Sequence, residues 1–284
     1  MIHRFAEDFW IRKHTGMQSS EFSSLIAQVL RGAAASEDGI YEATGLAENA
    51  DHLIPLLDER DESAHCRHLE NAGVVFTPQG YEPNYAYPLM INLDAEQEQS
   101  GENRFQEFMQ GLSDRNYLGL KPDGKLASEL GRLTQFPPVE MFEKCETALT
   151  LLRTVVGQLR KKYNIHTERI FLAGTGNRAE LALTLFLAQP EWFGGVVLLN
   201  GTFSGESTCL KNIEDLREKR VFLAVQPQPE ESPSQTEQTF VLSRLLHTAG
   251  LDVTTRVYEQ GQTQLPSILS DANHWAMGHI CTLV

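Results

Sequence analysis

The chain has 284 residues, of which 41% are hydrophobic and 22% charged, as in ordinary globular proteins of one large domain or a domain with an appendage. A net charge of −14, with no cluster of Lys and Arg, argues against a nucleic-acid partner. Charges interrupt the N-terminal segment, and no run reaches the roughly 18 apolar residues that cross a bilayer. We therefore expect no membrane association and a cytoplasmic location.

Residues 1–72 are predicted to form a helical extension. Apolar residues recur at helical spacing in its first half, at Phe22, Leu25, Ile26, Val29 and Leu30. Residues 50–71 form a second amphipathic segment, which contains His65, Cys66 and His68. Two histidines three positions apart, without further ligands, are a weak metal signal. The four cysteines are scattered without C-x-x-C spacing, so we expect reduced thiols, and we expect neither a metal nor a cofactor.

Strands are expected from Gly73 onward. Runs at 74–77 and 88–93 are predicted strands, and the second ends in Asp94-Ala95 before an acidic loop. A helix at 104–112, a strand at 117–120, a turn and loop at 121–138, and one long helix at 139–163 should follow.

The stretch 169–201 has the clearest pattern. Ile170 to Ala173 is a buried-strand run, followed by the small turn Gly174-Thr175-Gly176-Asn177, and apolar residues then recur at helical spacing until Pro190. A second buried-strand run, 195–199, completes a strand–helix–strand crossover. Such a unit predicts a parallel sheet with helices on its faces and a working site at the carboxyl ends of the strands.

This stretch resembles the nucleophile elbow of the α/β-hydrolases, specifically the esterase and phospholipase/carboxylesterase group, in which a strand runs into G-x-S-x-G and a helix. Gly176 occupies the serine position and Arg178 that of the second glycine. The resemblance covers residues 73–284 and implies a mostly parallel α/β-hydrolase-like sheet flanked by helices, preceded by the helical extension. Moving the register to make Thr175 the nucleophile breaks the spacing on both sides.

The other family positions are altered as well. Asp94-Ala95 replaces the His-Gly of the oxyanion loop, where a carboxylate opposes a developing oxyanion. After the expected strand 220–225, Glu230 or Glu231 stands nearest the position of the catalytic acid. After the expected strand 253–258, Gln262 or Thr263 takes the place of the histidine, and neither accepts a proton near neutral pH. Helices are expected at 236–248 and 268–277.

These losses predict a hydrolase fold without hydrolysis. No catalytic residue is intact, and the vestigial positions are Gly176, Glu231 and Thr263. We expect function by binding: a small ligand in a vestigial pocket, or a protein partner or second copy through the N-terminal helices. The pocket residues would be Asp94, Ala95, Thr175, Gly176 and Asn177.

Two alternatives remain open at this stage. One is an active serine esterase with a displaced nucleophile, Ser207 or Thr175, helped by His274, His247 or Glu231. Ser207 lies in Gly205-Glu206-Ser207-Thr208-Cys209, which only partly matches the motif and has no strand running into it. The other is a metal-dependent enzyme that uses His65, His68 or the C-terminal histidines.

Overall fold

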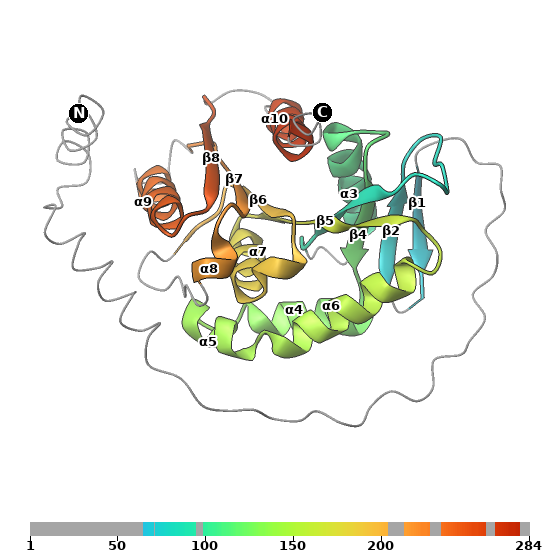
Figure 1. The fold of residues 1–284 in the computed structure, drawn as a ribbon, viewed down its shortest axis with the longest axis horizontal. Helices are drawn as coiled ribbons and strands as arrows, with labels where there is room; N and C mark the ends of the chain where they lie inside the picture. Colours follow the sequence, from blue (N-terminus) through green and yellow to red (C-terminus); the bar gives the residue numbers. More distant parts are fainter. Residues whose placement is uncertain are drawn as a thin grey trace, which may run out of the picture.

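One mixed sheet forms the centre of the molecule. A computed structural model describes residues 65–70, 72–94, 99–203, 213–227, 234–259 and 265–278, and Figure 1 shows the arrangement. The sheet order is β1-β2-β4-β3-β5-β6-β7-β8, antiparallel between β1, β2 and β4 and parallel from β4 to β8. The strands are β1 (His65–Leu69), β2 (Gly73–Thr77), β3 (Tyr87–Asn92), β4 (Leu118–Pro122), β5 (Ile165–Thr175), β6 (Gly195–Leu199), β7 (Arg220–Val225) and β8 (Asp252–Val257).

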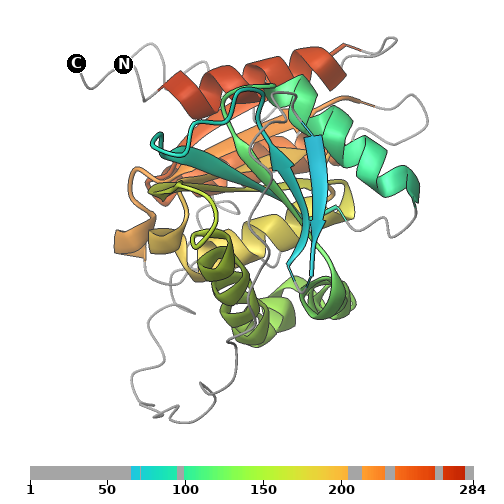
Figure 2. The same cartoon turned by 90° about the vertical axis from the view of Figure 1, so that its right-hand side faces the viewer.

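Helices cover both faces of this sheet, as buried parallel strands require. In Figure 2, α3 (green) and α10 (red) lie on one face, and the yellow-green helices lie on the other. Two buried apolar clusters match these layers, one between the sheet and the α3 and α10 pair, and one between the sheet and helices α4 to α7 and α9. The helices are α3 (Gln99–Leu112), α4 (Gly124–Leu133), α5 (Pro138–Lys144), α6 (Glu146–Leu159), α7 (Asn177–Ala188), the short 3-10 turn η1 (Pro190–Trp192), α8 (Ile213–Leu216), α9 (Ser234–Thr248) and α10 (Leu265–Gly278).

The predicted crossover from β5 through α7 to β6 is confirmed. β5 and β6 are parallel, with Ala173 opposite Val197. The helix between them is buried on nearly all sides, because it lies between the sheet and α5. This packing explains why its apolar residues are not confined to one narrow stripe. The elbow therefore stands at the carboxyl end of a central strand, as expected.

Three predictions about other elements were wrong. The segment 65–69 is a strand rather than helix, because it pairs antiparallel with β2, so the sheet begins inside the predicted helical extension. α4 lies where a turn and loop were expected, and Asp123 Oδ1 caps it by accepting a hydrogen bond from Gly124 N at 2.6 Å. The single long helix is two helices that meet at Cys145.

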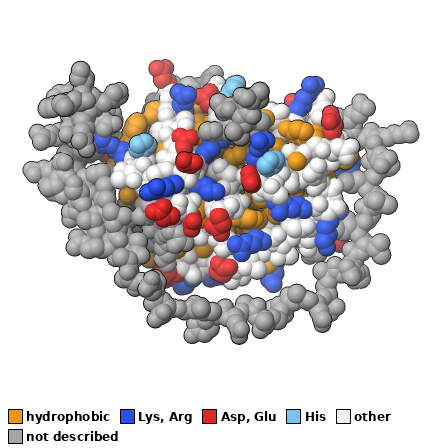
Figure 3. Space-filling view, viewed as in Figure 1, with side chains coloured by type: hydrophobic (Ala, Val, Ile, Leu, Met, Phe, Trp, Pro, Cys, Tyr) orange, Lys and Arg blue, Asp and Glu red, His pale blue; other side chains and the backbone are white. Residues whose placement is uncertain are grey.

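Some expectations concern residues that are not described, among them the helices predicted within residues 1–64. In the described ranges, no helix is long and apolar enough to span a membrane. On the face seen in Figure 3, basic and acidic side chains are interspersed, without a large patch of one sign.

Candidate functional site

The elbow is a tight turn between β5 and α7. Gly176 has φ 59° and ψ −124°, and its N–H donates to the Leu199 carbonyl of β6 at 2.9 Å. A residue with a side chain pays a conformational penalty in this region of φ and ψ, which glycine avoids. A Cβ built on Gly176 meets no heavy atom within 4 Å. The turn thus has the shape that would present a side chain into open space, and the residue there has none.

Close backbone packing holds this turn in place. A Cβ on Gly174 would lie 2.3 Å from the Arg178 carbonyl oxygen, so β5 touches the first turn of α7 there. A Cβ on Gly201, after β6, would lie 2.8 Å from the Ala179 Cβ. From the sequence, Arg178 stands at the position of the motif's second glycine, where a small residue would allow the helix to approach the strand. In the structure, Gly174 and Gly201 permit that approach, and the half-buried Arg178 side chain extends away to donate to the Leu130 carbonyl at 3.3 Å.

Asp94 is brought to the elbow from the neighbouring strand β3. Leu93 N donates to the Ala173 carbonyl at 2.9 Å, which ties the end of β3 to β5. The next residue, Asp94, accepts a hydrogen bond through Oδ1 from Thr175 N at 3.0 Å. Burial raises the pKa of Asp94, while hydrogen bonds from Thr175 and the positive charge of Arg178 oppose the rise. A carboxylate therefore faces the backbone of the elbow, as the sequence suggested.

Three of the predicted pocket residues lie together with Asp94 on this edge. Thr175 and Asn177 are exposed and Gly176 is partly exposed. The first turn of α7 begins at Asn177, so the positive end of the helix dipole is close to the turn. Thr175 donates through its backbone N–H to the Asp94 carboxylate, and its side chain is among the groups that lower the pKa of Asp94. The arrangement offers a hydroxyl beside a carboxylate, and it could hold a polar ligand by hydrogen bonds.

A second set of polar residues on the same sheet edge, which the sequence did not single out as a site, consists of Asn200, Gln226 and Gln235. Asn200, at φ 48°, follows β6, and its Oδ1 accepts from Gln226 N at 2.7 Å. The buried Gln235 of α9 donates through Nε2 to the Asn200 carbonyl at 3.1 Å. Asn before Gly at the end of a strand is a usable signal for positive φ, whereas nothing near Gln235 in the sequence distinguishes it. This group joins β6, β7 and α9 beside the elbow.

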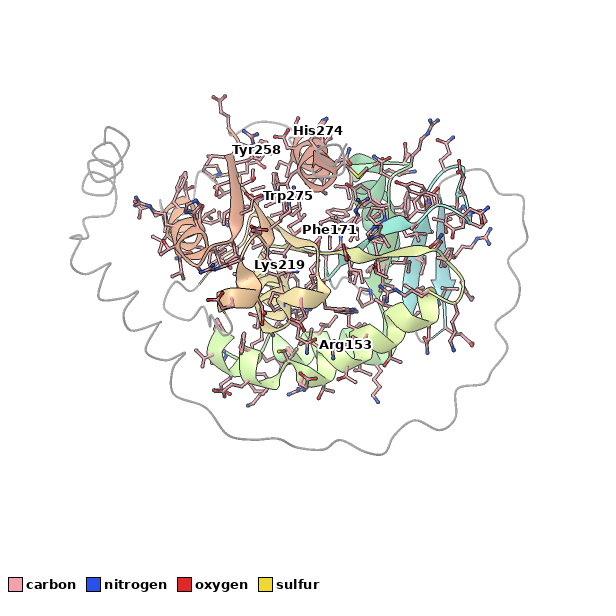
Figure 4. The ribbon with its side chains drawn as sticks, viewed as in Figure 1. Arg153, Phe171, Lys219, Tyr258, His274 and Trp275 are labelled. Atoms are coloured by element: carbon pink, nitrogen blue, oxygen red, sulfur yellow. The ribbon has the colours of Figure 1, made fainter. Side chains whose placement is uncertain are left out.

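The histidines considered as catalytic helpers lie elsewhere on the described surface. His274 is an exposed residue of α10 and is labelled in Figure 4. His247 is exposed near the end of α9. Neither makes a hydrogen bond to Thr175 or Asp94 within the described ranges. His68 on β1 instead pairs with Asp123 at 2.9 Å. No group of three or more His, Cys, Asp or Glu with metal-binding geometry occurs among the described residues.

Several predicted site residues lie outside the described ranges. They are Ala95, Ser207, Glu230, Glu231, Gln262 and Thr263. Their assignments stay predictions.

Comparison with known proteins identifies the architecture. No protein-family model matches the chain, and no curated protein does. Solved structures do match. A thermostable esterase is 18% identical with a TM-score of 0.53, over 76% of this chain and 62% of the esterase, so the chain spans less than two thirds of that protein. The S-formylglutathione hydrolase FrmB from Staphylococcus aureus is 11% identical with a TM-score of 0.51, over 79% and 99% of the two chains.

A third match is the BES protein from Bacillus cereus, at 16% identity and a TM-score of 0.51, over 80% of this chain and 99% of that one. At these identities the likeness concerns the fold. Together with the sheet order and the elbow, it shows that the chain has the α/β-hydrolase fold.

Proposed function

We propose that this protein is a hydrolase-fold protein that has lost ester hydrolysis and acts by binding. The observation that carries the proposal is Gly176. The elbow keeps the backbone conformation and the open space that a nucleophile needs, but glycine supplies no atom to attack a carbonyl carbon. A scaffold that retains this turn without its reactive group is suited to presenting backbone and neighbouring side chains to a ligand.

Asp94 supports the same proposal by its charge. Hydrolysis of an ester develops negative charge on the carbonyl oxygen, and preorganised donors at the elbow normally stabilise it. Here the Asp94 carboxylate already accepts from the elbow backbone at Thr175 N. A second negative charge at this position would be repelled. Loss of a single oxyanion donor costs about 10²–10³ in turnover in the subtilisin example, and an opposing charge acts in the same direction.

The binding role has two candidate surfaces. One is the elbow edge, where Thr175, Gly176 and Asn177 lie beside Asp94; it would take a small polar ligand, and Ala95 belongs to it as a sequence prediction. The other is the N-terminal segment, whose predicted amphipathic helices would engage a protein partner or a second copy. We expect both roles in the cytoplasm, without a nucleic acid, membrane, metal or cofactor.

An active hydrolase with a displaced nucleophile is the second candidate, because of one contact. Thr175 is exposed at the elbow and donates through its N–H to the Asp94 carboxylate, so its hydroxyl belongs to a residue held beside a base, and such a pair is the minimum for nucleophilic attack. Ser207 remains a candidate by sequence alone.

The deciding experiment measures hydrolysis of p-nitrophenyl acetate and butyrate by the purified full chain. Variants Thr175→Ala, Ser207→Ala and Gly176→Ser are compared with Thr202→Ala, which removes an exposed threonine near the end of β6. We expect no turnover above the buffer rate by the parent chain. Turnover that disappears in Thr175→Ala or Ser207→Ala, but persists in Thr202→Ala, would refute the proposal and identify the nucleophile.

A further inference from the structure

Among the described strands, β8 pairs with β7 alone, so its outer edge offers backbone groups to a further strand. β8 is the last strand of the described sheet, beside α9 in Figure 1. Asp252 N donates to the Lys219 carbonyl at 2.9 Å and Tyr258 N to the Val225 carbonyl at 3.0 Å, so even-numbered residues face β7. Because alternate residues of a strand point their backbone groups to opposite sides, Val253, Thr255 and Val257 direct N–H and C=O outward. Such an edge can template pairing with another strand.

The end of this strand is held firmly, so the edge keeps a defined shape. Tyr258, directly after β8, donates through its hydroxyl to Asp271 of α10 at 2.8 Å, and Figure 4 shows it at the tip of the strand. On the other side, Ser243 of α9 and Thr255 of β8 share a hydrogen bond of 2.8 Å. Helices on both faces therefore anchor β8.

The charges on β8 lie in a symmetric pattern. Asp252 and Arg256 lie two residues before and after Thr254, and both are exposed. Charges on edge strands usually deter pairing because like charges would meet. If the β8 strands of two copies paired antiparallel about Thr254, Asp252 of each copy would lie opposite Arg256 of the other. The dimer would then contain two such pairs of opposite charge. Asp252 also lies 4.0 Å from Arg220 of β7, so the new contact would extend an existing pair.

We propose that β8 pairs antiparallel with β8 of a second copy of this chain, across a twofold axis at Thr254. The backbone directions fit this register. Val253 of each copy would exchange two hydrogen bonds with Thr255 of the other, while Thr254 and the charged residues would form the closer non-hydrogen-bonded pairs, with Cα atoms about 4.5 Å apart. The interface is self-complementary, as a twofold dimer requires, and the two sheets become one.

A strand pair of this length buries less than the roughly 800 Å² per partner of a standard interface, so α9 must contribute. Ser243 faces β8, and Phe240 lies three residues earlier on the same stripe of the helix. Phe240 is partly exposed. In the dimer, the two α9 helices would lie side by side across the axis on one face of the joined sheet.

Charge reversal tests the pairing directly. The mass of the purified full chain is measured by sedimentation and by light scattering over a dilution series, for the parent and for Arg256→Asp, Asp252→Arg and the double variant. Each single variant places like charges opposite each other twice, and we expect a dimer weakened by about tenfold or more. The double variant restores opposite charges and should dimerise. A 1:1 mixture of the two single variants should also dimerise, because one then carries two acids and the other two arginines.

Arg115→Asp, a reversal at an exposed arginine after α3, is the matched control and should dimerise like the parent. A parent chain that stays monomeric at about 100 µM would overturn the proposal, as would a dimer indifferent to Arg256→Asp. Single variants that stay apart when mixed would overturn the Thr254 register.

Hydrogen exchange supplies a readout that needs no variant. In the proposed dimer the amides of Val253 and Thr255 should exchange slowly at high concentration and quickly on dilution. In this register Val257 lies opposite Leu251 of the second copy, whose carbonyl can accept from the Val257 N–H, so Val257 should be protected in the same concentration-dependent way. Absence of concentration-dependent protection at all three positions would overturn the interface.

Discussion

The strained turn at Gly176 can be tested by comparing one substitution at two glycines. Gly176→Ala adds a methyl group that meets no atom within 4 Å, so its cost comes from the backbone conformation alone. A residue with a side chain held in such a region costs about 1–3 kcal/mol. The loss of unfolded-chain entropy returns about 0.4–1 kcal/mol. We therefore expect a net destabilisation of about 0.5–2 kcal/mol.

Gly131→Ala is the matched control. This glycine lies in α4, and an added Cβ also meets nothing within 4 Å. Alanine is favoured over glycine in a helix by about 0.5–1 kcal/mol, so the same substitution should stabilise the chain. Both sites offer open space, and only the backbone conformation differs.

The assay is urea denaturation of parent and variants, supported by thermal melting, where about 1 kcal/mol shifts Tm by roughly 2–4 °C for a domain of this size. The two variants should move the unfolding midpoint in opposite directions. If Gly176→Ala stabilised the chain as much as Gly131→Ala, the turn would not hold φ near 59°, and the elbow would not be preserved. Gly176→Ser should behave like Gly176→Ala, because the hydroxyl also enters open space.

Two further predictions concern the neighbours of this turn. Gly174→Ala should lower the free energy of unfolding by about 2–4 kcal/mol, more than Gly176→Ala does, because the added Cβ would lie 2.3 Å from the Arg178 carbonyl oxygen. Urea denaturation measures this loss. A loss equal to or smaller than that of Gly176→Ala would contradict the close packing. Burial raises the pKa of Asp94 above the ordinary 3.8, so the folded chain keeps this proton at pH values where the unfolded chain has released it. Its contribution to stability is therefore largest at low pH and declines as pH rises through the folded pKa. Asp94→Asn should remove the decline that begins as the pH rises past the ordinary value of 3.8, whereas parallel stability curves of parent and variant would contradict it.

The local patterns of the chain were sufficient for much of the sheet. The runs at 195–199 and 220–225 are strands with those bounds, because buried parallel strands are continuous apolar runs. The turn after Ala173 was predicted from its small residues and from the change of period that follows. By contrast, β1 has a mixed and partly exposed sequence, and its pairing with β2 cannot be seen locally. α4 was missed because Asp123 and Gly124 indicate a turn as much as a helix start.

The sequence by itself determined that Gly176 stands where the motif has its serine, since this depends only on which residue follows Thr175. It also determined the crossover unit and the acid at the end of β3, because residue type and period are local properties. Only the tertiary structure decided that the Asp94 carboxylate lies 3.0 Å from Thr175 N. It also showed that Gly174 and Gly201, rather than a small residue at position 178, allow α7 to approach the strands closely. It alone set β8 at the open edge with Asp252 and Arg256 placed around Thr254. The physical reason is that such contacts join residues far apart in the chain, and their geometry depends on how strands and helices pack against one another rather than on any local pattern.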